Sequence, residues 1–266
     1  MRTTILCGRT DKEYYKKVEP KMNTAIVVGA SSGIGQEIAS RLITKGWRVA
    51  LAARRRSLLL PLLDKAPNGS IAVQLDVCED SAVTLLDQIF QRMGHVDLYF
   101  HVSGIGKMNA SLLPDIEEST VLTNAYGFTR MVGEAYRLMT AQGGGHIAVV
   151  SSIAGVRGLG AAPSYSATKA FQHFYLQALE QQAHVSKTKV RFTEIRPGFI
   201  DTPLLKGSHF PMTMPLGYAV DRIMKAVEAY RHVEIIDWRY QALVFLWRRV
   251  PACLWRRMNV GIRQKR

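Results

Sequence analysis

The stretch Ala25-Ile-Val-Val-Gly29-Ala-Ser-Ser-Gly33-Ile-Gly35 passes from an apolar, β-branched run into three closely spaced glycines. This pattern predicts a buried strand that turns into a helix, with backbone amides free at the positive helix N-terminus. A pyrophosphate can approach these amides because glycine has no side chain. We therefore expect a dinucleotide site here, with a glycine turn that holds no ligand as the alternative. The expected contacts are Gly29, Ser31, Ser32, Gly33, Ile34 and Gly35.

From residue 22 onward, short β-rich runs alternate with longer amphipathic segments, which is typical of a parallel sheet covered by helices. The expected strands are Ala25–Val28, Arg48–Ala52, Ile71–Leu75, Leu98–Val102, His146–Val150, Lys189–Ile195 and Val233–Ile236. The expected helices are Gly35–Lys45, Ser57–Asp64, Ser81–Met93, Ile116–Ala141, Ser164–His184 and Tyr218–Tyr230. We expect an α/β fold over residues 22–237, with a single doubly wound parallel sheet of about seven strands, a Rossmann fold.

The composition is that of an ordinary folded protein, since 47% of the 266 residues are apolar and 21% are charged. The three cysteines, Cys7, Cys78 and Cys253, are too few and too scattered for a disulfide framework, and the histidines lack metal-ligand spacing. No run of about 20 apolar residues is long enough to span a bilayer. We expect a cytoplasmic protein that needs no metal. Residues 1–21 resemble a flexible leader, and Met22 is an alternative start.

The net charge of +14 lies mainly at the two ends of the chain. Residues 238–266 carry eight cations, no acid and the three tryptophans Trp238, Trp247 and Trp255. Such a basic, aromatic extension is typical of a segment that contacts an anionic membrane peripherally, here at the inner face. A C-terminal helix packed on its own domain or on a second subunit is equally open. The body of the chain is nearly neutral, so nucleic-acid binding is not expected.

The segment Leu51-Ala-Ala-Arg54-Arg55-Arg56, at the end of the second expected strand, carries three guanidinium groups and no acid. An acid here would bond a ribose 2′-hydroxyl and repel a 2′-phosphate, whereas guanidinium groups bind a phosphate by charge-assisted hydrogen bonds. We therefore expect NADP(H) rather than NAD(H), with Arg54 and Arg55 as ligands. The alternative is a basic loop that contacts only solvent.

A second informative stretch is Ser151-Ser152, followed by Tyr165-Ser-Ala-Thr-Lys169 at the start of a long helical segment. Four residues are about one helical turn, so Tyr165 and Lys169 lie on the same face. A neighbouring ammonium lowers the pKa of a phenol from about 10, as an acid/base catalyst at neutral pH requires. The pair therefore predicts a proton donor for a carbonyl, although the pattern alone also fits a surface pair.

With these motifs in order, the chain resembles the short-chain dehydrogenase/reductase family from about residue 22 to residue 202. The glycine spacing is similar to that of the family's common short subtype. Asp76 and Val77 resemble the family's adenine-contacting pair, and Asn124 resembles its helix asparagine. Ser152 and Tyr165 resemble the catalytic serine and tyrosine. The segment that closes over the nicotinamide is resembled by Pro197, Gly198 and Thr202.

This resemblance implies a role for each member of the catalytic set. Tyr165 would be the general acid, Lys169 would hold the nicotinamide ribose and lower the tyrosine pKa, Ser152 would bond the substrate oxygen, and Asn124 would hold a water. The implied activity is hydride transfer between NADP(H) and a carbonyl or hydroxyl group. A non-catalytic NADP(H)-binding sensor or assembly protein on the same fold is the alternative.

Two departures from the family pattern affect the cofactor side. Val28 stands where the family usually has threonine, and His101-Val102-Ser103-Gly104 stands where it usually has Asn-Asn-Ala-Gly. A polar link between two strands is thus replaced by apolar packing. Such a replacement has little effect on stability when both partners change together. We still expect Ser103 and Gly104 to contact the cofactor, and we expect His101 to be a half-buried structural residue rather than a proton relay.

The expected substrate loops are Gly104–Leu113, Ile153–Ala162 and Pro203–Gly217, outside the carboxyl ends of the strands. The last loop offers an apolar lid, or simple packing over the core, and favours an apolar, even lipid-like, ketone or alcohol as substrate. Its apolar residues are Leu204, Leu205, Phe210, Met212 and Met214. The resemblance also implies a homo-oligomer that associates through the long helices Ile116–Ala141 and Ser164–His184.

Overall fold

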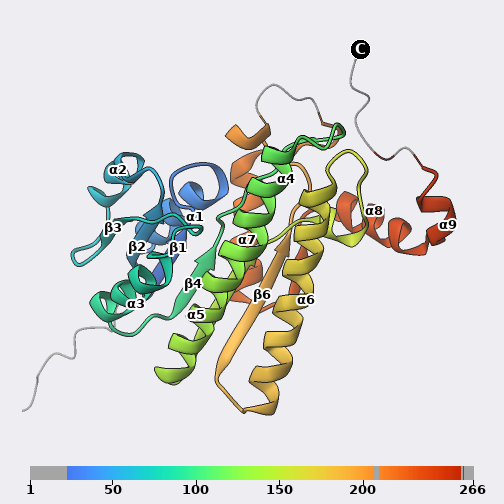
Figure 1. The fold of residues 1–266 in the computed structure, drawn as a ribbon. Coiled ribbons are helices and arrows are strands. Elements are labelled where there is room, and N and C mark those ends of the chain that lie inside the picture. The colour runs from blue at the N-terminus through green and yellow to red at the C-terminus, as the bar shows by residue number, and fades with distance from the viewer. Residues whose placement is uncertain (1–22, 206–209, 259, 261–266) are drawn as a thin grey trace, which may run out of the picture.

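The computed structural model describes residues 23–205, 210–258 and 260 (Figure 1). The expected leader 1–21, Cys7 and His209 lie outside these residues. Seven strands form one parallel sheet in the order β3-β2-β1-β4-β5-β6-β7, which confirms the expected doubly wound α/β fold. The strands are β1 Thr24–Val28, β2 Arg48–Ala53, β3 Ile71–Gln74, β4 Leu98–His101, β5 Gly145–Val150, β6 Val190–Arg196 and β7 Val233–Ile235.

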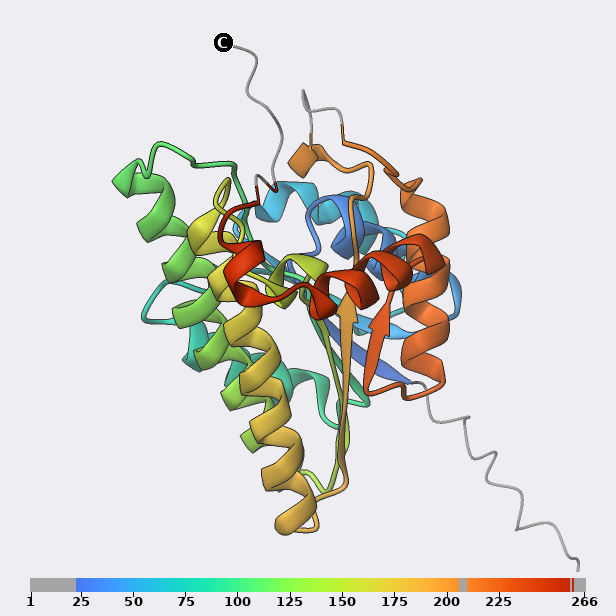
Figure 2. The same cartoon turned by 90° about the vertical axis from the view of Figure 1, so that its right-hand side faces the viewer.

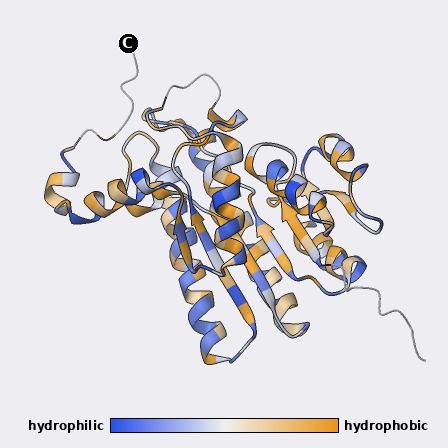
Figure 3. Cartoon of the chain, turned by 180° about the vertical axis from the view of Figure 1, so that it is seen from behind, coloured by the Kyte–Doolittle hydropathy of each residue, from blue (hydrophilic) through white to orange (hydrophobic). Residues whose placement is uncertain are grey.

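Helices cover both faces of the sheet, because successive residues of a strand point to opposite sides. On β1, Ala25 and Val27 pack beneath α1 and α7, whereas Ile26 and Val28 pack beneath α3, α5 and α6. In Figure 3 these helices carry both hydrophobic and hydrophilic residues, as amphipathic covering helices do. Their bounds are α1 Gly33–Thr44, α3 Ala82–Met93, α5 Phe128–Ala141, α6 Pro163–Val185 and α7 Leu216–Glu228.

Two expected helices are divided in the structure. The segment expected as Ile116–Ala141 consists of α4 Pro114–Val121, a wider π-helical turn η2 Leu122–Gly127, and α5. The segment expected as Ser57–Asp64 is a 3₁₀ turn, η1 Arg56–Leu58, followed by the single turn α2 Leu60–Leu63, in which proline occupies one of the first two positions. Only the π-helical turn matters for the site, because it carries Asn124.

The strand order reverses at β1, which lies between β2 and β4. Val28, the last residue of β1, is in register with Ala52 on one side and His101 on the other. In doubly wound sheets, ligands bind outside the carboxyl ends of the strands at the point where the strand order reverses. The fold therefore places the expected dinucleotide site, at the glycine turn after β1, at this point of the sheet.

The C-terminal segment packs on the sheet domain. Helix α8 (Trp238–Arg249) buries Tyr240 and Val244 in the core, and the short α9 (Ala252–Trp255) follows it. Figure 2 shows both helices lying across the ends of β6 and β7. Packing on its own domain is thus the arrangement found for this segment. In the described part of the chain, no helix is both long enough and apolar enough to cross a membrane.

Candidate active site

The glycine turn packs closely against the end of β4. Gly29 has φ +94°, and a side-chain carbon there would lie 2.7 Å from the backbone nitrogen of Ser103. A side-chain carbon on Gly35 would lie 2.2 Å from the carbonyl oxygen of Gly29, which is far inside van der Waals contact. The amide of Gly29 also donates to the carbonyl of Ala52 at 2.8 Å. Only glycine fits at both positions, so the sequence pattern reflects a real steric requirement.

Helix α1 follows the glycine turn, and a pyrophosphate would approach its first residue. Gly33 is the first residue of α1, and Ser32 precedes it in an extended conformation without a side-chain capping bond. Thr202 lies over this turn, since a side-chain carbon on Gly33 would come within 3.4 Å of it. Ile34 packs on the hydrophobic core beneath. The structure thus brings Thr202 to the glycine turn, although the two are far apart in the sequence.

The residues that depart from the family pattern, at the ends of β1 and β4, leave the backbone hydrogen bond between these strands in place. The amide of Val102 donates to the carbonyl of Val28 at 2.8 Å. His101 is only 1% exposed, so it is more deeply buried than expected, and its Nδ1 lies 3.1 Å from the Tyr99 hydroxyl. Burial lowers the pKa of His101 to about 3, with the charge of Lys169 as a second cause. A neutral, packed imidazole agrees with a structural role and not with a proton relay.

The arginine cluster lies at the end of β2, beside the glycine turn. Arg54, Arg55 and Arg56 are all exposed. Nη2 of Arg55 donates to the hydroxyl of Ser31 at 3.4 Å, which brings a guanidinium group to the edge of the turn. Nε of Arg56 is directed toward the carbonyl of Ala72, at 3.4 Å. Arg54 and Arg55 are therefore the guanidinium groups available to an anion at this edge.

The pair expected to contact an adenine follows β3. The side chain of Asp76 accepts from the amide of Cys78 at 3.0 Å, which forms a tight turn. Val77 is buried against the π-helical turn, where a side-chain carbon on Gly127 would lie 2.7 Å from its Cγ2. Both residues thus lie at the same edge of the sheet as the glycine turn.

Tyr165 and Ser152 lie together at the start of α6. A hydrogen bond between the two side chains lowers the pKa of the phenol, but burial is the larger effect and raises it. The ring packs against Gly106, where a side-chain carbon would lie 2.6 Å from Cε2. Nζ of Lys169 is 5.8 Å from the ring centroid. The pKa of Tyr165 is therefore raised in this structure, contrary to the expected lowering, because burial outweighs the hydrogen bond from Ser152.

Lys169 is 4% exposed, and its ammonium group faces Gly104 and the π-helical turn. It donates to the carbonyl of Val150 at 3.3 Å and to Oε1 of Gln172 at 3.0 Å. Burial lowers the pKa of Lys169 to about 8, although Glu194 acts in the opposite direction. Gln172 is a member of the site that the sequence patterns did not indicate.

Asn124, which is fully buried in the π-helical turn, holds the chain that leaves β4. Its side chain accepts from the amide of Ile105 at 2.9 Å and donates to the Ile105 carbonyl at 2.7 Å. Its own carbonyl accepts from Nε2 of Gln172 at 2.9 Å. Asn124 therefore fixes the loop beside Gly104, and its backbone carbonyl is directed toward Gln172.

A buried ionic network lies behind the site and was also not anticipated. The carboxylate of Glu194 on β6 accepts from Ser151 at 2.6 Å, from Nε of Arg196 at 2.8 Å, and contacts Nδ1 of His173 at 2.9 Å. Burial alone would raise the Glu194 pKa, but these partners together lower it to about 2. The carboxylate is thus ionised at neutral pH and favours the ammonium form of Lys169.

The segment that follows β6 is held from two sides. The carbonyl of Pro197 accepts from the amide of Ile153 at 3.1 Å. A side-chain carbon on Gly198 would lie 2.2 Å from the ring of Tyr240, so the tail helix packs directly on this glycine. The Tyr240 hydroxyl accepts from the amide of Phe199 at 3.1 Å. Helix α8, in the C-terminal segment, therefore helps to hold the segment that follows β6 in place.

The expected apolar lid divides into inward and outward residues. Met214 is fully buried in the core, whereas Leu204 is 55% exposed. Phe210 stacks on Phe199 with ring centroids 4.1 Å apart. Residues 206–209 lie outside the described part of the chain. Among the described residues of this loop, Met214 thus packs in the core, and Leu204 and Met212 present apolar side chains at the surface.

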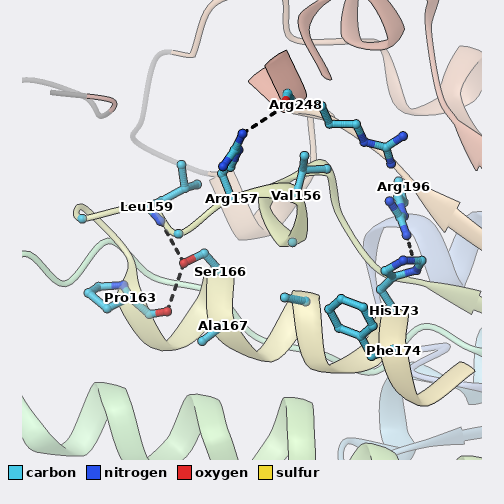
Figure 4. Close-up of a pocket in the computed structure, with 14 residues that line it drawn as sticks. Val156, Arg157, Leu159, Pro163, Ser166, Ala167, His173, Phe174, Arg196 and Arg248 are labelled. Atoms are coloured by element: carbon cyan, nitrogen blue, oxygen red, sulfur yellow. Dashed lines mark hydrogen bonds between the residues drawn. The ribbon is translucent and has the colours of Figure 1, made fainter. Parts of the chain in front are cut away.

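A cavity of about 610 Å³ lies beside α6 (Figure 4). The amide of Leu159 and the carbonyl of Pro163 both bond the Ser166 hydroxyl, and Nη2 of Arg157 donates to the carbonyl of Arg248. None of the four expected catalytic residues lines it. Its lining residues are Gly155, Val156, Arg157, Gly158, Leu159, Gly160, Pro163, Ser166, Ala167, Ala170, His173, Phe174, Arg196 and Arg248.

Comparison with known proteins gives consistent matches. The family model for short chain dehydrogenases matches residues 23–210. An uncharacterized oxidoreductase of Myxococcus xanthus is 34% identical over 73% of this chain and 78% of its own length. A structure of an actinorhodin polyketide ketoreductase variant with NADPH is 29% identical over 69% of this chain and 72% of that one, with a TM-score of 0.61.

A Burkholderia cenocepacia short chain dehydrogenase in complex with NADP covers 91% of this chain and 98% of its own, with a TM-score of 0.77 at 22% identity. This last likeness shows the fold. The family model spans most of the chain and includes the glycine turn, Ser152, Tyr165 and Lys169. The chain therefore belongs to the short-chain dehydrogenase/reductase family of oxidoreductases.

Proposed function

We propose that the protein is an NADP(H)-dependent oxidoreductase that transfers hydride between the nicotinamide and a carbonyl or hydroxyl carbon of an apolar substrate. One observation carries the proposal. Ser152, Tyr165, Lys169 and Asn124 converge at the carboxyl edge of the sheet, where a side-chain carbon on Gly104 would lie 3.6 Å from Nζ of Lys169. A protein that only bound the cofactor would have no need of this proton-transfer set.

The residues present fit a phosphorylated dinucleotide. The glycine turn lacks the side chains that would block a pyrophosphate, and α1 begins at Gly33. Arg54 and Arg55 are exposed beside Ser31, where charge-assisted bonds to a ribose 2′-phosphate are available. When bound, the nicotinamide supplies or accepts the hydride. The complexes of the similar ketoreductase with NADPH and of the similar dehydrogenase with NADP support this assignment.

In this proposal, each of the four polar side chains has its own task. The hydroxyls of Ser152 and Tyr165 donate hydrogen bonds to the oxygen, on which negative charge develops. Tyr165 then gives up its proton as the general acid. The ammonium of Lys169 favours the resulting phenolate and holds a ribose hydroxyl, since its third N–H remains for a ligand. Asn124 keeps the loop after β4 in place.

The substrate is proposed to be an apolar ketone or alcohol. The loop after β4 exposes Met108, Leu112 and Leu113, and the segment after η4 (Pro203–Leu205) exposes Met212. These side chains favour a hydrophobic body rather than a charged one. The test is a screen of apolar ketones with NADPH, in which absorbance reports oxidation of the cofactor. Steady turnover of at least one ketone is expected. A negative screen with a protein that binds NADPH tightly would instead favour the non-catalytic alternative.

Replacing Arg54 and Arg55 together with serine is expected to weaken NADPH binding by about 10- to 100-fold and to leave NADH binding nearly unchanged. The two guanidinium groups touch only the 2′-phosphate in the proposed complex, and this group is absent from NADH. Fluorescence titration at fixed salt measures both affinities. Arg92→Ser, on α3, is the control for a general loss of positive charge. An equal loss for both cofactors would contradict the role of the cluster.

We also propose a peripheral contact between α8–α9 and an anionic lipid surface. Trp238, Phe245 and Leu246 are 71%, 55% and 60% exposed, on the face opposite buried Tyr240. The arginines that accompany them are Arg248, Arg249, Arg256 and Arg257. Exposed aromatic rings and arginines on one amphipathic segment favour insertion at the headgroup level.

Flotation with vesicles tests this contact on the full chain, because truncation at residue 238 would remove the buried Tyr240. Binding to vesicles that contain phosphatidylglycerol is expected, with weaker binding to phosphatidylcholine alone. The double variant Phe245→Ser and Leu246→Ser should lose it, and Gln177→Ser on α6 should not. If the double variant floats like the native chain, the contact is wrong. Loss of a dimer in the double variant, without any flotation, would assign the face to a second copy.

A further inference from the structure

The side chain of Gln172 forms a bridge inside the proposed active site. Gln172 lies three residues after Lys169 on α6 and is 1% exposed. Its Oε1 accepts from Nζ of Lys169 at 3.0 Å, and its Nε2 donates to the carbonyl of Asn124 at 2.9 Å. An ammonium only donates and a carbonyl only accepts, so the two partners fix the orientation of the amide.

We propose that Gln172 is a positioning residue, which holds the Lys169 ammonium in its charged form and in register with the π-helical turn; this inference rests on the proposed function of Lys169. Among the described residues, Nζ has two protein acceptors, Oε1 of Gln172 and the carbonyl of Val150. An ammonium has three N–H groups. The two acceptors therefore leave one N–H, and they set the direction in which it points.

Neighbouring elements provide the other charges around this ammonium. On β6, the carboxylate of Glu194 favours the charged lysine, but Arg196 and His173 share it. On β4, His101 is kept neutral by burial, and on α6 itself the ring of Tyr165 lies 5.8 Å away. None of these groups hydrogen-bonds Nζ, and Oε1 of Gln172 is the closer of its two hydrogen-bond acceptors among the described residues.

Removal of this acceptor should change the pKa of Lys169 in one direction only. Burial already disfavours the ammonium and lowers its pKa to about 8. With leucine at position 172, the buried charge loses one of its two protein hydrogen bonds, and the Asn124 carbonyl loses a donor. The pKa of Lys169 should therefore fall by about one further unit. The neutral lysine would then begin to accumulate within the physiological range.

The experiment compares Gln172→Leu with Gln177→Leu, a matched change at an exposed position of the same helix. Lysine labelled with ¹³C at Cε reports the pKa by NMR, and Lys169→Met identifies the signal by its absence. The same variants are assayed for ketone reduction across pH. For Gln172→Leu we expect the lysine titration and the alkaline limb of kcat/KM to shift down together. For Gln177→Leu we expect neither to move.

The two readouts separate failure of the inference from failure of the proposed function. If the native protein reduces no carbonyl compound, the proposed function fails, and the NMR titration still tests Gln172. If the pKa of Lys169 is the same in Gln172→Leu, Gln177→Leu and the native chain, the inference is overturned. Should Gln172→Leu not fold, Gln172→Met replaces it. Gln172→Glu keeps an acceptor and is expected to hold the lysine pKa at or above its native value.

Discussion

Tyr165→Phe is expected to lower turnover of a ketone substrate by about 10²- to 10⁴-fold and to change NADPH affinity by less than about twofold. The substitution removes one hydroxyl group and keeps the ring that packs on Gly106. Ser152 alone can still bond the substrate oxygen, but it has no general acid behind it. The loss should therefore appear in kcat and not in the binding of the cofactor.

Stopped-flow and steady-state assays with the best ketone from the screen measure this effect. Tyr175→Phe, about three turns further along α6 and only half-buried, is the matched control and should keep native turnover. A loss smaller than about tenfold for Tyr165→Phe would show that the proton comes from elsewhere. Equal losses in both variants would indicate a general disturbance of α6 rather than chemistry at Tyr165.

The fold could be predicted from the sequence because its signals are local. Alternation of β-rich runs with amphipathic segments marks strands and helices over a few residues each. The steric requirement at Gly35 is also local, since a side-chain carbon there would meet the carbonyl of Gly29. The strand-to-helix turn and the position of the cofactor edge follow from these patterns.

The partners of the lysine could not be predicted, because they depend on contacts between distant segments. Gln172 on α6 donates to the carbonyl of Asn124, which lies 48 positions earlier in the π-helical turn. The direction of the Tyr165 pKa shift could not be predicted either, because it depends on burial of the phenol by distant segments. Spacing along a helix reveals the nearby ammonium, but it does not reveal how much of the phenol is buried.

The tail gives a second example of this limit. Its composition indicates a basic, aromatic segment and does not distinguish a surface helix from a packed one. Tyr240 is completely buried, and it contacts Gly198, which precedes it by 42 positions. A glycine and a tyrosine this far apart carry no shared sequence pattern, although each is required by the other's shape.

Tyr240→Ala is expected to destabilise the protein by about 3–5 kcal/mol, because a large buried aromatic ring is replaced by a cavity. The melting temperature should fall by on the order of 10 °C. Differential scanning fluorimetry measures this change. Trp238→Ala, on the exposed face of the same helix, is the control and should melt close to the native temperature. A native melting temperature for Tyr240→Ala would mean that α8 does not pack on the domain in solution.

Tyr240→Phe removes the hydroxyl and keeps the ring, so it tests whether α8 affects the cofactor site. The hydroxyl accepts from the amide of Phe199 at 3.1 Å and donates to the carbonyl of Met212 at 3.0 Å, so it ties both ends of the segment that carries Thr202. Without it, stability should fall by only about 1 kcal/mol. Thr202 would lose its fixed place over Gly33, and NADPH should bind several-fold more weakly, by titration at a temperature where the variant is fully folded. Unchanged affinity would show that the segment holds its position over the glycine turn without the tail.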